Sequence, residues 1–345
     1  MTAAPNLDTD LGADRDLDRE LERSAERAFR LPVVSGVLAV AFLVVAVLVS
    51  VSQGAAGIPS AGVLRALADA LPFVSVDTGL TGSQEAVLWS IRLPRTALGA
   101  LVGAALAMAG AGYQGVFRNP LADPYLLGVS AGAGLGAVLA LGFGLDLGWG
   151  PFSPVAAAAF LGAVLAVLGS AVVARGSFST PATLLLSGVA IAALFSAMQT
   201  FALQRLDQTQ AREVLSWLFG KLATAGWEPV LLLLPYVVVG AVVLVLHARH
   251  LDVLRLGDDE ARSLGLDPAR SRLVIIAVAT LLTAAAVSVS GLIAFVGLVV
   301  PHVVRLLGGH SYRVIVPVSA VLGAAFLASV DVGARTVAAP AELPV

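Results

Sequence analysis

Apolar stretches long enough to cross a lipid bilayer recur along the chain, and they constrain its fold more than any other feature. A membrane-spanning helix needs about 20 mostly apolar residues, and 58% of the 345 residues are hydrophobic whereas only 13% are charged. The apolar stretches lie at residues 31–51, 94–114, 124–144, 152–174, 183–204, 228–248, 273–290, 292–307 and 314–331. Many of their residues are glycine or alanine, which let helix backbones approach closely in lipid. The sequence therefore predicts an all-α polytopic membrane protein in which about nine spans form one packed bundle.

The first 30 residues are polar and acidic, unlike the rest of the chain. They lack the short basic stretch and the following apolar stretch of a cleavable signal peptide. We predict that residues 1–30 form a polar cytoplasmic segment and that residues 31–345 form the transmembrane domain. With the N-terminus inside, about two-thirds of the 21 Lys and Arg residues fall in cytoplasmic segments, as the positive-inside rule expects.

One connection on the predicted cytoplasmic side is long enough to have a role of its own. Residues 251–272 read LDVLRLGDDEARSLGLDPARSR, in which apolar residues alternate with charges and Gly257, Gly265 and Pro268 interrupt the pattern. This pattern predicts two short amphipathic helices on the cytoplasmic face.

The sequence disfavours several kinds of site. Cysteine is absent, which excludes disulfides and thiolate metal sites, and a net charge of -2 gives no reason to expect a nucleic-acid partner. The GxGxxG pattern at Gly110–Gly115 lies in a predicted span and follows no strand, so it predicts helix packing instead of dinucleotide binding. The single lysine, Lys221, is not part of a phosphate-binding Walker A loop. His247 and His250 stand at a span end without a carboxylate cluster, which favours interfacial anchoring over a metal site.

Acidic residues are scarce within the predicted spans. Asp331 lies at a predicted helix end, and no acidic residue lies inside a predicted span away from its ends. Ion-coupled secondary transporters carry ionisable groups inside the membrane, and an intramembrane enzyme would need a catalytic motif such as HExxH, which is absent here. Both alternatives are therefore disfavoured, and we expect an external source of energy for transport.

Arginines gather at the predicted outer surface. Arg92 and Arg95 stand three residues apart in the sequence RLPR, and Arg335 is expected on the same face. These side chains suit two roles. They can anchor the protein at the membrane interface, or they can form two-pronged contacts with carboxylates of a docking protein.

Two long blocks of sequence resemble the permease family of the siderophore, cobalamin and haem ABC importers. They are QGVFRNPLADPYLLGVSAGA at residues 114–133 and GLIAFVGLVVPHVVR at residues 291–305. Shorter blocks reinforce the resemblance: RLPR at Arg92–Arg95, WLFG at Trp217–Gly220, LGDDEARSLG at Leu256–Gly265, DVGAR at Asp331–Arg335 and the final ELPV. The likeness covers nearly everything from about residue 30 onward.

The resemblance implies an architecture and a set of partners. In that family each permease subunit has ten helices, whereas this sequence provides about nine before Val345. Two permease subunits, identical or homologous, form the channel in the bilayer of the cytoplasmic membrane. A cassette ATPase that binds ATP and Mg lies beneath each subunit, and a substrate-binding protein docks outside. The chain itself is then expected to be a transport permease without cofactors and not an enzyme.

The resemblance also assigns roles to individual residues. Arg92, Arg95 and Arg335 are expected to meet acids of the binding protein. The expected ATPase-coupling residues are Gly257, Asp258, Glu260, Ala261, Leu264 and Gly265. The gate is expected near residues 175–183. For each residue that could line the path or the gate, a role in helix packing is an equal alternative. These candidates are Gln114, Asn119, Pro120, Ser130, Ser179, Thr180, Pro301 and His302. The expected cargo is a ferric siderophore, with haem and cobalamin as alternatives within the family.

Overall fold

The computed structural model describes most of the chain from residue 34 onward. The described residues are 34–54, 57–70, 72–73, 75–144, 153–174, 181–222, 226–308, 311–337, 339 and 342–344. The predicted cytoplasmic segment 1–30 lies outside them, as does most of the expected gate region 175–183, including Ser179 and Thr180. Within the described part, all regular structure is helical, so the predicted fold class is confirmed.

Seven of the described helices are long and apolar enough to cross a membrane. They are Val34–Ser52, the continuous helix Gly82–Phe117, α6 (Pro154–Val173), α7 (Pro181–Leu203), α9 (Glu228–Leu246), α12 (Pro268–Ser290) and α14 (Tyr312–Thr336). Two shorter apolar helices, α5 (Val129–Gly142) and α13 (Val296–Leu306), occupy the other two predicted windows. The described helices therefore account for all the predicted spans.

The two shorter helices begin later than predicted. The window 124–144 starts in a loop, and α5 begins only after Gly128, whose φ of 84° is left-handed and interrupts a helix. The window 292–307 likewise begins in an irregular segment, because Gly291 (φ 70°) and Phe295 (φ 68°) both adopt positive φ values. Apolar composition continues through these breaks, so hydropathy placed both helix starts too early.

The remaining helices lie at the ends of the bundle or within longer helices. They are α2 (Ser60–Asp69), α3 (Gly82–Val87), α8 (Gln208–Leu218), α10 (Ala248–Leu254) and α11 (Asp258–Ser263). A π-helical turn, η1 (Leu88–Arg92), connects α3 to α4 (Leu93–Phe117). Of the two short helices predicted within 251–272, α11 lies wholly in this segment, whereas α10 begins before it, at Ala248.

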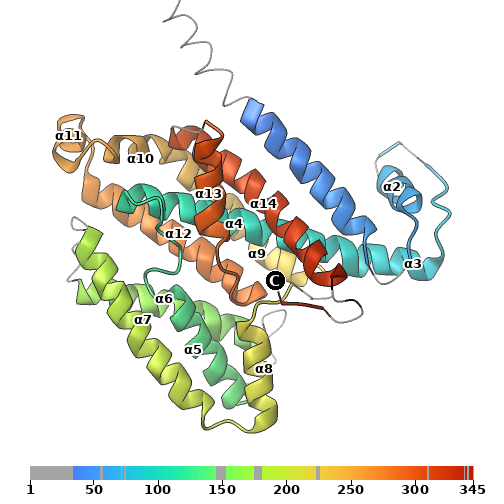
Figure 1. Cartoon of the computed structure of the whole chain (residues 1–345), viewed down its shortest axis with the longest axis horizontal. Helices are drawn as coiled ribbons and strands as arrows, with labels where there is room; N and C mark the ends of the chain where they lie inside the picture. Colours follow the sequence, from blue (N-terminus) through green and yellow to red (C-terminus); the bar gives the residue numbers. More distant parts are fainter. Residues whose placement is uncertain are drawn as a thin grey trace, which may run out of the picture.

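Helix α4 forms the centre of the main bundle, and α9, α12, α13 and α14 pack around it (Figure 1). Glycines make this close packing possible. A Cβ atom on Gly103 would lie 2.1 Å from the carbonyl oxygen of Gly323 in α14, and one on Gly110 would lie 1.8 Å from the carbonyl oxygen of Gly297 in α13. The GxGxxG pattern is thus part of a helix-packing surface, as predicted.

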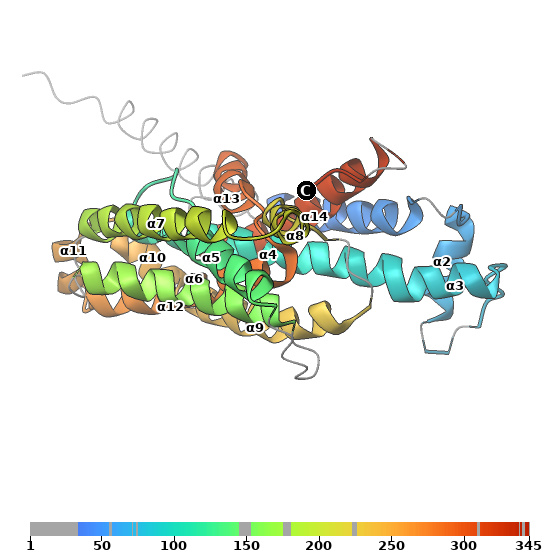
Figure 2. The same ribbon diagram turned by 90° about the horizontal axis from the view of Figure 1, so that it is seen from below.

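A second group of helices, α5 to α8, lies beside the main bundle (Figure 1). Helices α5 and α6 also meet through glycine, since a Cβ atom on Gly132 would lie 2.2 Å from the carbonyl oxygen of Gly162. Helix α12 packs against α6 and connects the two groups. Helices α4, α6, α7, α9 and α12 run along a common long direction in the perpendicular view (Figure 2).

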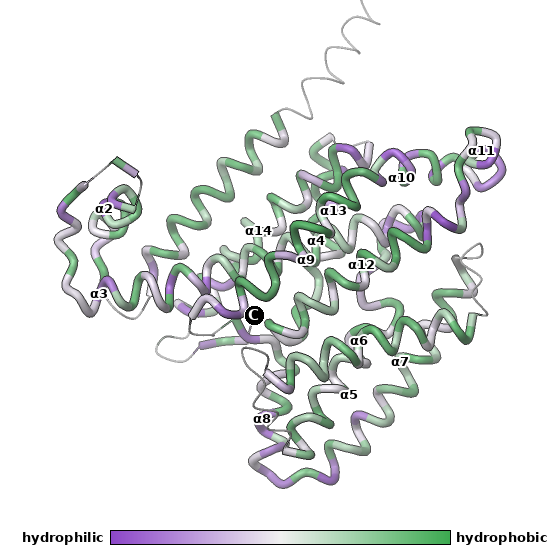
Figure 3. The backbone as a smooth tube through the Cα atoms, turned by 180° about the vertical axis from the view of Figure 1, so that it is seen from behind, coloured by the Kyte–Doolittle hydropathy of each residue, from purple (hydrophilic) through white to green (hydrophobic). Residues whose placement is uncertain are grey.

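The polarity of the surface follows this arrangement. The spans are mostly hydrophobic, and hydrophilic residues gather at the ends, most clearly around α10 and α11 (Figure 3). Large apolar side chains on the spans, such as Leu186 and Leu246, are exposed on the outside of the bundle. Such a surface is stable in the hydrocarbon core of a membrane and not in water.

Candidate functional site: two ionic clusters at opposite ends of helix α4

The first cluster is centred on Asp331 of α14. Arg95 of α4 donates to this carboxylate from Nε to both oxygens at 3.1 Å and from Nη2 to Oδ1 at 2.8 Å. Arg335, one turn further along α14, places its Nε 3.0 Å from Oδ2. Asp331 is only 1% exposed, so two guanidinium groups neutralise a carboxylate that the bundle buries. We call this set, together with Arg92, the arginine cluster.

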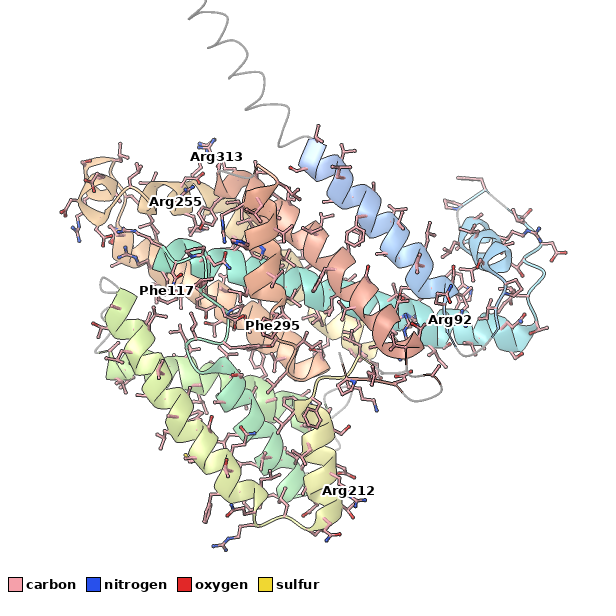
Figure 4. The ribbon with its side chains drawn as sticks, in the orientation of Figure 1. Arg92, Phe117, Arg212, Arg255, Phe295 and Arg313 are labelled. Atoms are coloured by element: carbon pink, nitrogen blue, oxygen red, sulfur yellow. The ribbon has the colours of Figure 1, made fainter. Side chains whose placement is uncertain are left out.

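Further hydrogen bonds tie the arginine cluster to helix Val34–Ser52. Arg92 donates from Nη1 to the carbonyl oxygens of Val51 at 3.0 Å and Ser52 at 2.9 Å. Arg335 donates from Nη2 to the hydroxyl oxygen of Ser50 at 2.9 Å. Figure 4 shows Arg92 where helix Val34–Ser52, α4 and the end of α14 come together. The cluster therefore joins three spans at one end of the bundle.

The arginine cluster corrects one expectation from the sequence. Arg92, Arg95 and Arg335 do lie together, but they were expected at an exposed surface, and Arg92 and Arg95 are only 4% and 7% exposed. Asp331, expected at a helix end, lies inside α14 and provides the counter-charge. Burial requires each guanidinium to have hydrogen-bond acceptors, and the protein's own carboxylates and carbonyl groups provide them.

A cavity of about 370 Å³ opens beside this cluster. Arg95, Lys221, Ser216, Phe219 and Glu342 line it together with neighbouring residues. Arg95 donates from Nη1 to the two carboxylate oxygens of Glu342 at 2.9 and 3.0 Å, and the Glu342 side chain is 46% exposed. One edge of the Arg95 guanidinium therefore faces a carboxylate that solvent can reach.

The second cluster is centred on Asp258, at the start of α11. Arg272 of α12 donates from Nη1 to Oδ2 at 2.8 Å and from Nη2 to Oδ1 at 2.6 Å. Arg118, the C-cap of α4, donates to the same carboxylate from Nη2. Hydrogen bonds from Arg272, reinforced by the charge of Arg118, lower the pKa of Asp258 to about 2, although partial burial opposes the shift. We call these residues the Asp258 cluster.

Helix α11 has one side that faces the bundle and one that faces outward. Asp258 and the fully buried Ala261 face inward. Glu260 and Gly265 are exposed, and Leu264 is 63% exposed. Gly257 (φ 136°) and Gly265 (φ 81°) adopt backbone conformations that favour glycine at the two ends of the helix. The predicted coupling residues are thus divided between the two sides.

The path candidates are dispersed. Gln114 is buried on α4, where its Nε2 donates to the carbonyl oxygens of Gly297 at 3.3 Å and Leu298 at 3.2 Å and its Oε1 accepts from Arg305. The Asn119 side chain accepts from the backbone N–H of Leu121 at 2.9 Å. Pro120 is exposed in the same loop, Ser130 is partly buried on α5, Pro301 is buried within α13 and His302 is exposed on α13. Gln114 and Asn119 therefore have internal structural roles in this conformation.

Sequence reasoning missed the partners in both clusters. In the sequence, Arg272 is only the last residue of the 251–272 segment, Arg118 belongs to the block at residues 114–133 and Glu342 belongs to the final ELPV block. Arg118 and Asp258 are 140 residues apart, and Arg95 and Glu342 are 247 residues apart, so no local spacing indicates that they meet. His247 and His250 pack edge to face with ring centroids 4.9 Å apart.

The fold defines a polytopic helical membrane protein, and comparison with known proteins gives its family and its class. The model of the FecCD transport family matches residues 42–345, and the chain belongs to this family. It is 39% identical to the ABC transporter permease protein YvrB of Bacillus subtilis, which is itself uncharacterised, over 88% of this chain and 86% of the relative. It is also 39% identical to the iron(3+)-hydroxamate import system permease protein FhuB of the same organism, over 86% of this chain and 74% of the relative.

A solved structure supports the assignment. A protein described as an ABC transporter of the metal-chelate type, in an inward-facing conformation, matches with a TM-score of 0.75 and 29% identity over 93% of each chain. Relatives of similar identity carry names for cobalamin and haemin import. The chain is thus the permease component of an ABC importer and not an enzyme, because ATP hydrolysis in such importers belongs to a separate subunit.

Proposed function

We propose that this permease carries a ferric siderophore across the cytoplasmic membrane after a substrate-binding protein delivers it. The observation that carries the proposal is the match to the FecCD transport family over residues 42–345. An iron(3+)-hydroxamate permease among the relatives favours an iron chelate as cargo, and the metal-chelate transporter among the solved structures agrees with this class of cargo, as it does with haem and cobalamin. Haem or cobalamin is the second candidate, because permeases named for haemin and cobalamin import match at 37% and 39% identity.

We place the N-terminus and the Asp258 cluster on the cytoplasmic side and the arginine cluster on the outer side. The distribution of Lys and Arg supports this orientation. In this orientation, the hydrophilic end formed by α10 and α11 is on the cytoplasmic side, where an ATPase can bind (Figure 3).

The arginine cluster is the docking site that we propose for acids of the binding protein. Its cavity is lined by two cations, Arg95 and Lys221, and one acid, Glu342, and the net positive charge of this lining attracts carboxylates. All three arginines bind internal acceptors, but one partner of Arg95, the Glu342 carboxylate, is half exposed, so Arg95 is the member best placed to exchange a partner. Such contacts orient the partner more than they hold it, since a partly exposed ion pair contributes about 0.2–1 kcal/mol.

The outward side of α11 is the contact that we propose for the cassette ATPase, which binds ATP and Mg. Glu260, Leu264 and Gly265 are available there, and an exposed leucine suits insertion into a groove of a partner protein. Since a pair of ATPases needs two such contacts, we propose that the chain works with a second permease subunit, identical or homologous. Among the path candidates, Ser130 and His302 are those we propose for contact with cargo.

Uptake into proteoliposomes tests the proposal. The permease is reconstituted with its ATPase and with binding protein loaded with a ferric hydroxamate siderophore that contains radioactive iron. We expect iron uptake that requires ATP and disappears when the ATPase carries an inactive phosphate-binding loop. Uptake that persists without the ATPase would support an ion-coupled transporter instead. A binding protein that captures haemin or cobalamin and no ferric siderophore would replace the cargo and leave the class of transporter unchanged.

A further inference from the structure

Arg118 lies where the long central helix meets the cytoplasmic loop. It caps α4 in a left-handed conformation (φ 50°), which turns the chain out of the helix directly after Phe117. Its Nε donates to the carbonyl oxygen of Leu254 at 2.6 Å, and its Nη2 donates to the carboxylate of Asp258. One guanidinium group thus binds the last residue of α10 and the first residue of α11.

The position of α4 gives this contact its significance. Helix α4 is buried along most of its length and packs against α9, α12, α13 and α14. At Gly103 and Gly110 the backbones of α14 and α13 lie so close to α4 that there is no room for a Cβ atom between them. A displacement of α4 must therefore move the helices that surround it.

Helix α11 has two attachments to the bundle through Asp258. Arg272 connects it to α12 with two hydrogen bonds, and Arg118 connects it to α4. The Arg272 attachment is complete without Arg118, since both Asp258 oxygens accept from Arg272. Loss of Arg118 should therefore leave α11 in place while it removes the direct connection to α4.

We propose that Arg118 is a positioning residue that couples movement of α11 to α4, through its hydrogen bonds to Asp258 and to the carbonyl group of Leu254. This inference rests on the proposed function, in which the ATPase contacts the outward side of α11. In this arrangement the Asp258 carboxylate faces the bundle and holds α11 in place, whereas the exposed Leu264 and Glu260 contact the ATPase. Arginine suits this role because its planar, permanently charged group can bind two acceptors at once in a fixed geometry.

The decisive variant is Arg118→Gln, with Arg118→Lys as the conservative change. Lysine keeps the positive charge beside Asp258, but its single ammonium group cannot reproduce the planar guanidinium that also donates to the carbonyl oxygen of Leu254. Arg313→Gln is the matched control, because it removes the same charge from an exposed residue at the same end of the bundle (Figure 4). Three quantities are measured in proteoliposomes with ATPase and loaded binding protein: retention of the ATPase on the permease, the rate of ATP hydrolysis, and radioactive iron delivered per ATP hydrolysed.

We expect Arg118→Gln to retain the ATPase and to hydrolyse ATP like the unmodified permease, but to deliver about ten-fold less iron per ATP, a typical size for the loss of coupling between two sites. The iron delivered per ATP by Arg118→Lys should lie between the values of Arg118→Gln and the unmodified permease. Arg313→Gln should deliver as much iron per ATP as the unmodified permease. In a double-mutant cycle, Arg118→Gln should add little to Asp258→Asn, since the two residues act through one contact.

Iron delivery per ATP that is unchanged in Arg118→Gln would overturn the inference. Loss of ATPase retention in Arg118→Gln would also overturn the inference, because it would show that Arg118 only maintains the surface of α11 to which the ATPase binds. Fully additive effects in the cycle would contradict a shared contact. If the unmodified permease itself fails to retain the ATPase, the proposed function is wrong, and this result is distinguishable from all the others.

Discussion

Arg95 and Asp331 form a two-pronged ion pair that connects α4 to α14, with contacts of 2.8 and 3.1 Å and a carboxylate that is 1% exposed. Arg335 shares the same carboxylate. The pair therefore holds two of the most buried spans together at the end that we assign to the outer side. It also makes Asp331 the residue that allows both guanidinium groups to be buried.

Replacement of Asp331 by Asn should strongly destabilise the bundle. The guanidinium group of Arg335 would lose its counter-charge and that of Arg95 would keep only the half-exposed Glu342, and removal of one partner from a buried pair typically costs about 3–5 kcal/mol. Thermal unfolding of the detergent-solubilised protein measures the change. Asp259→Asn is the matched control, since Asp259 pairs with Arg262 on the exposed side of α11 and an exposed pair contributes about 0.2–1 kcal/mol. Equal melting temperatures for the two variants would contradict the structural role of Asp331.

Glu342 should compete with the binding protein for Arg95. Its carboxylate contacts the same guanidinium group and is half exposed. Glu342→Gln should therefore raise docking affinity by about two- to five-fold at low salt, the range that a partly exposed ion pair supports. Surface plasmon resonance with nanodisc-embedded permease measures this affinity. Arg95→Gln should abolish the gain, and Glu228→Gln, an exposed acid at the N-terminus of α9, serves as the control. A lower affinity for Glu342→Gln would show that Glu342 orders the docking site instead of competing for it.

The sequence predicted the spans well because the length of an apolar stretch is a local property. Hydropathy failed at the starts of α5 and α13, where the backbone turns at Gly128 and Phe295 without a change in polarity. The family resemblance brought Arg92, Arg95 and Arg335 together correctly. It gave no indication that Asp331 and Glu342 already satisfy Arg95, because such pairing depends on how distant helices pack.

The glycine contacts predict that two Gly→Ala substitutions differ sharply in their effect on stability. Gly110→Ala would place a Cβ atom 1.8 Å from the backbone oxygen of Gly297, and a backbone group cannot move aside as a side chain can. We expect α4 and α13 to be forced apart, with a loss of at least about 1–3 kcal/mol, as in other overpacked interiors. Gly36→Ala, near the start of helix Val34–Ser52 with nothing within 4 Å of the new atom, should cause no loss. Size-exclusion profiles after stepwise heating compare the two, and equal stability would show that α4 and α13 are not packed this closely.

The attachment of α11 should be independent of pH until strongly acidic conditions. Hydrogen bonds from Arg272 hold the pKa of Asp258 at about 2, below its ordinary value of 3.8. A carboxyl group whose pKa is lowered by folding stabilises the folded form above its ordinary pKa, and this contribution is lost as the pH falls toward the lowered value. The contacts should therefore be complete at pH 7 and pH 5 and weaken only between about pH 4 and pH 2.

Because the chain contains no cysteine, a single introduced residue can report this behaviour. A spin label on Leu264→Cys, at the exposed end of α11, should show constant mobility from pH 7 to about pH 4 and increasing mobility below it. In the Asp258→Asn background the label should already be mobile at pH 7. A label on Leu307→Cys, in the loop after α13, controls for general unfolding in acid. An increase in mobility of the Leu264 label between pH 7 and pH 5 would mean that a group other than Asp258 holds the helix.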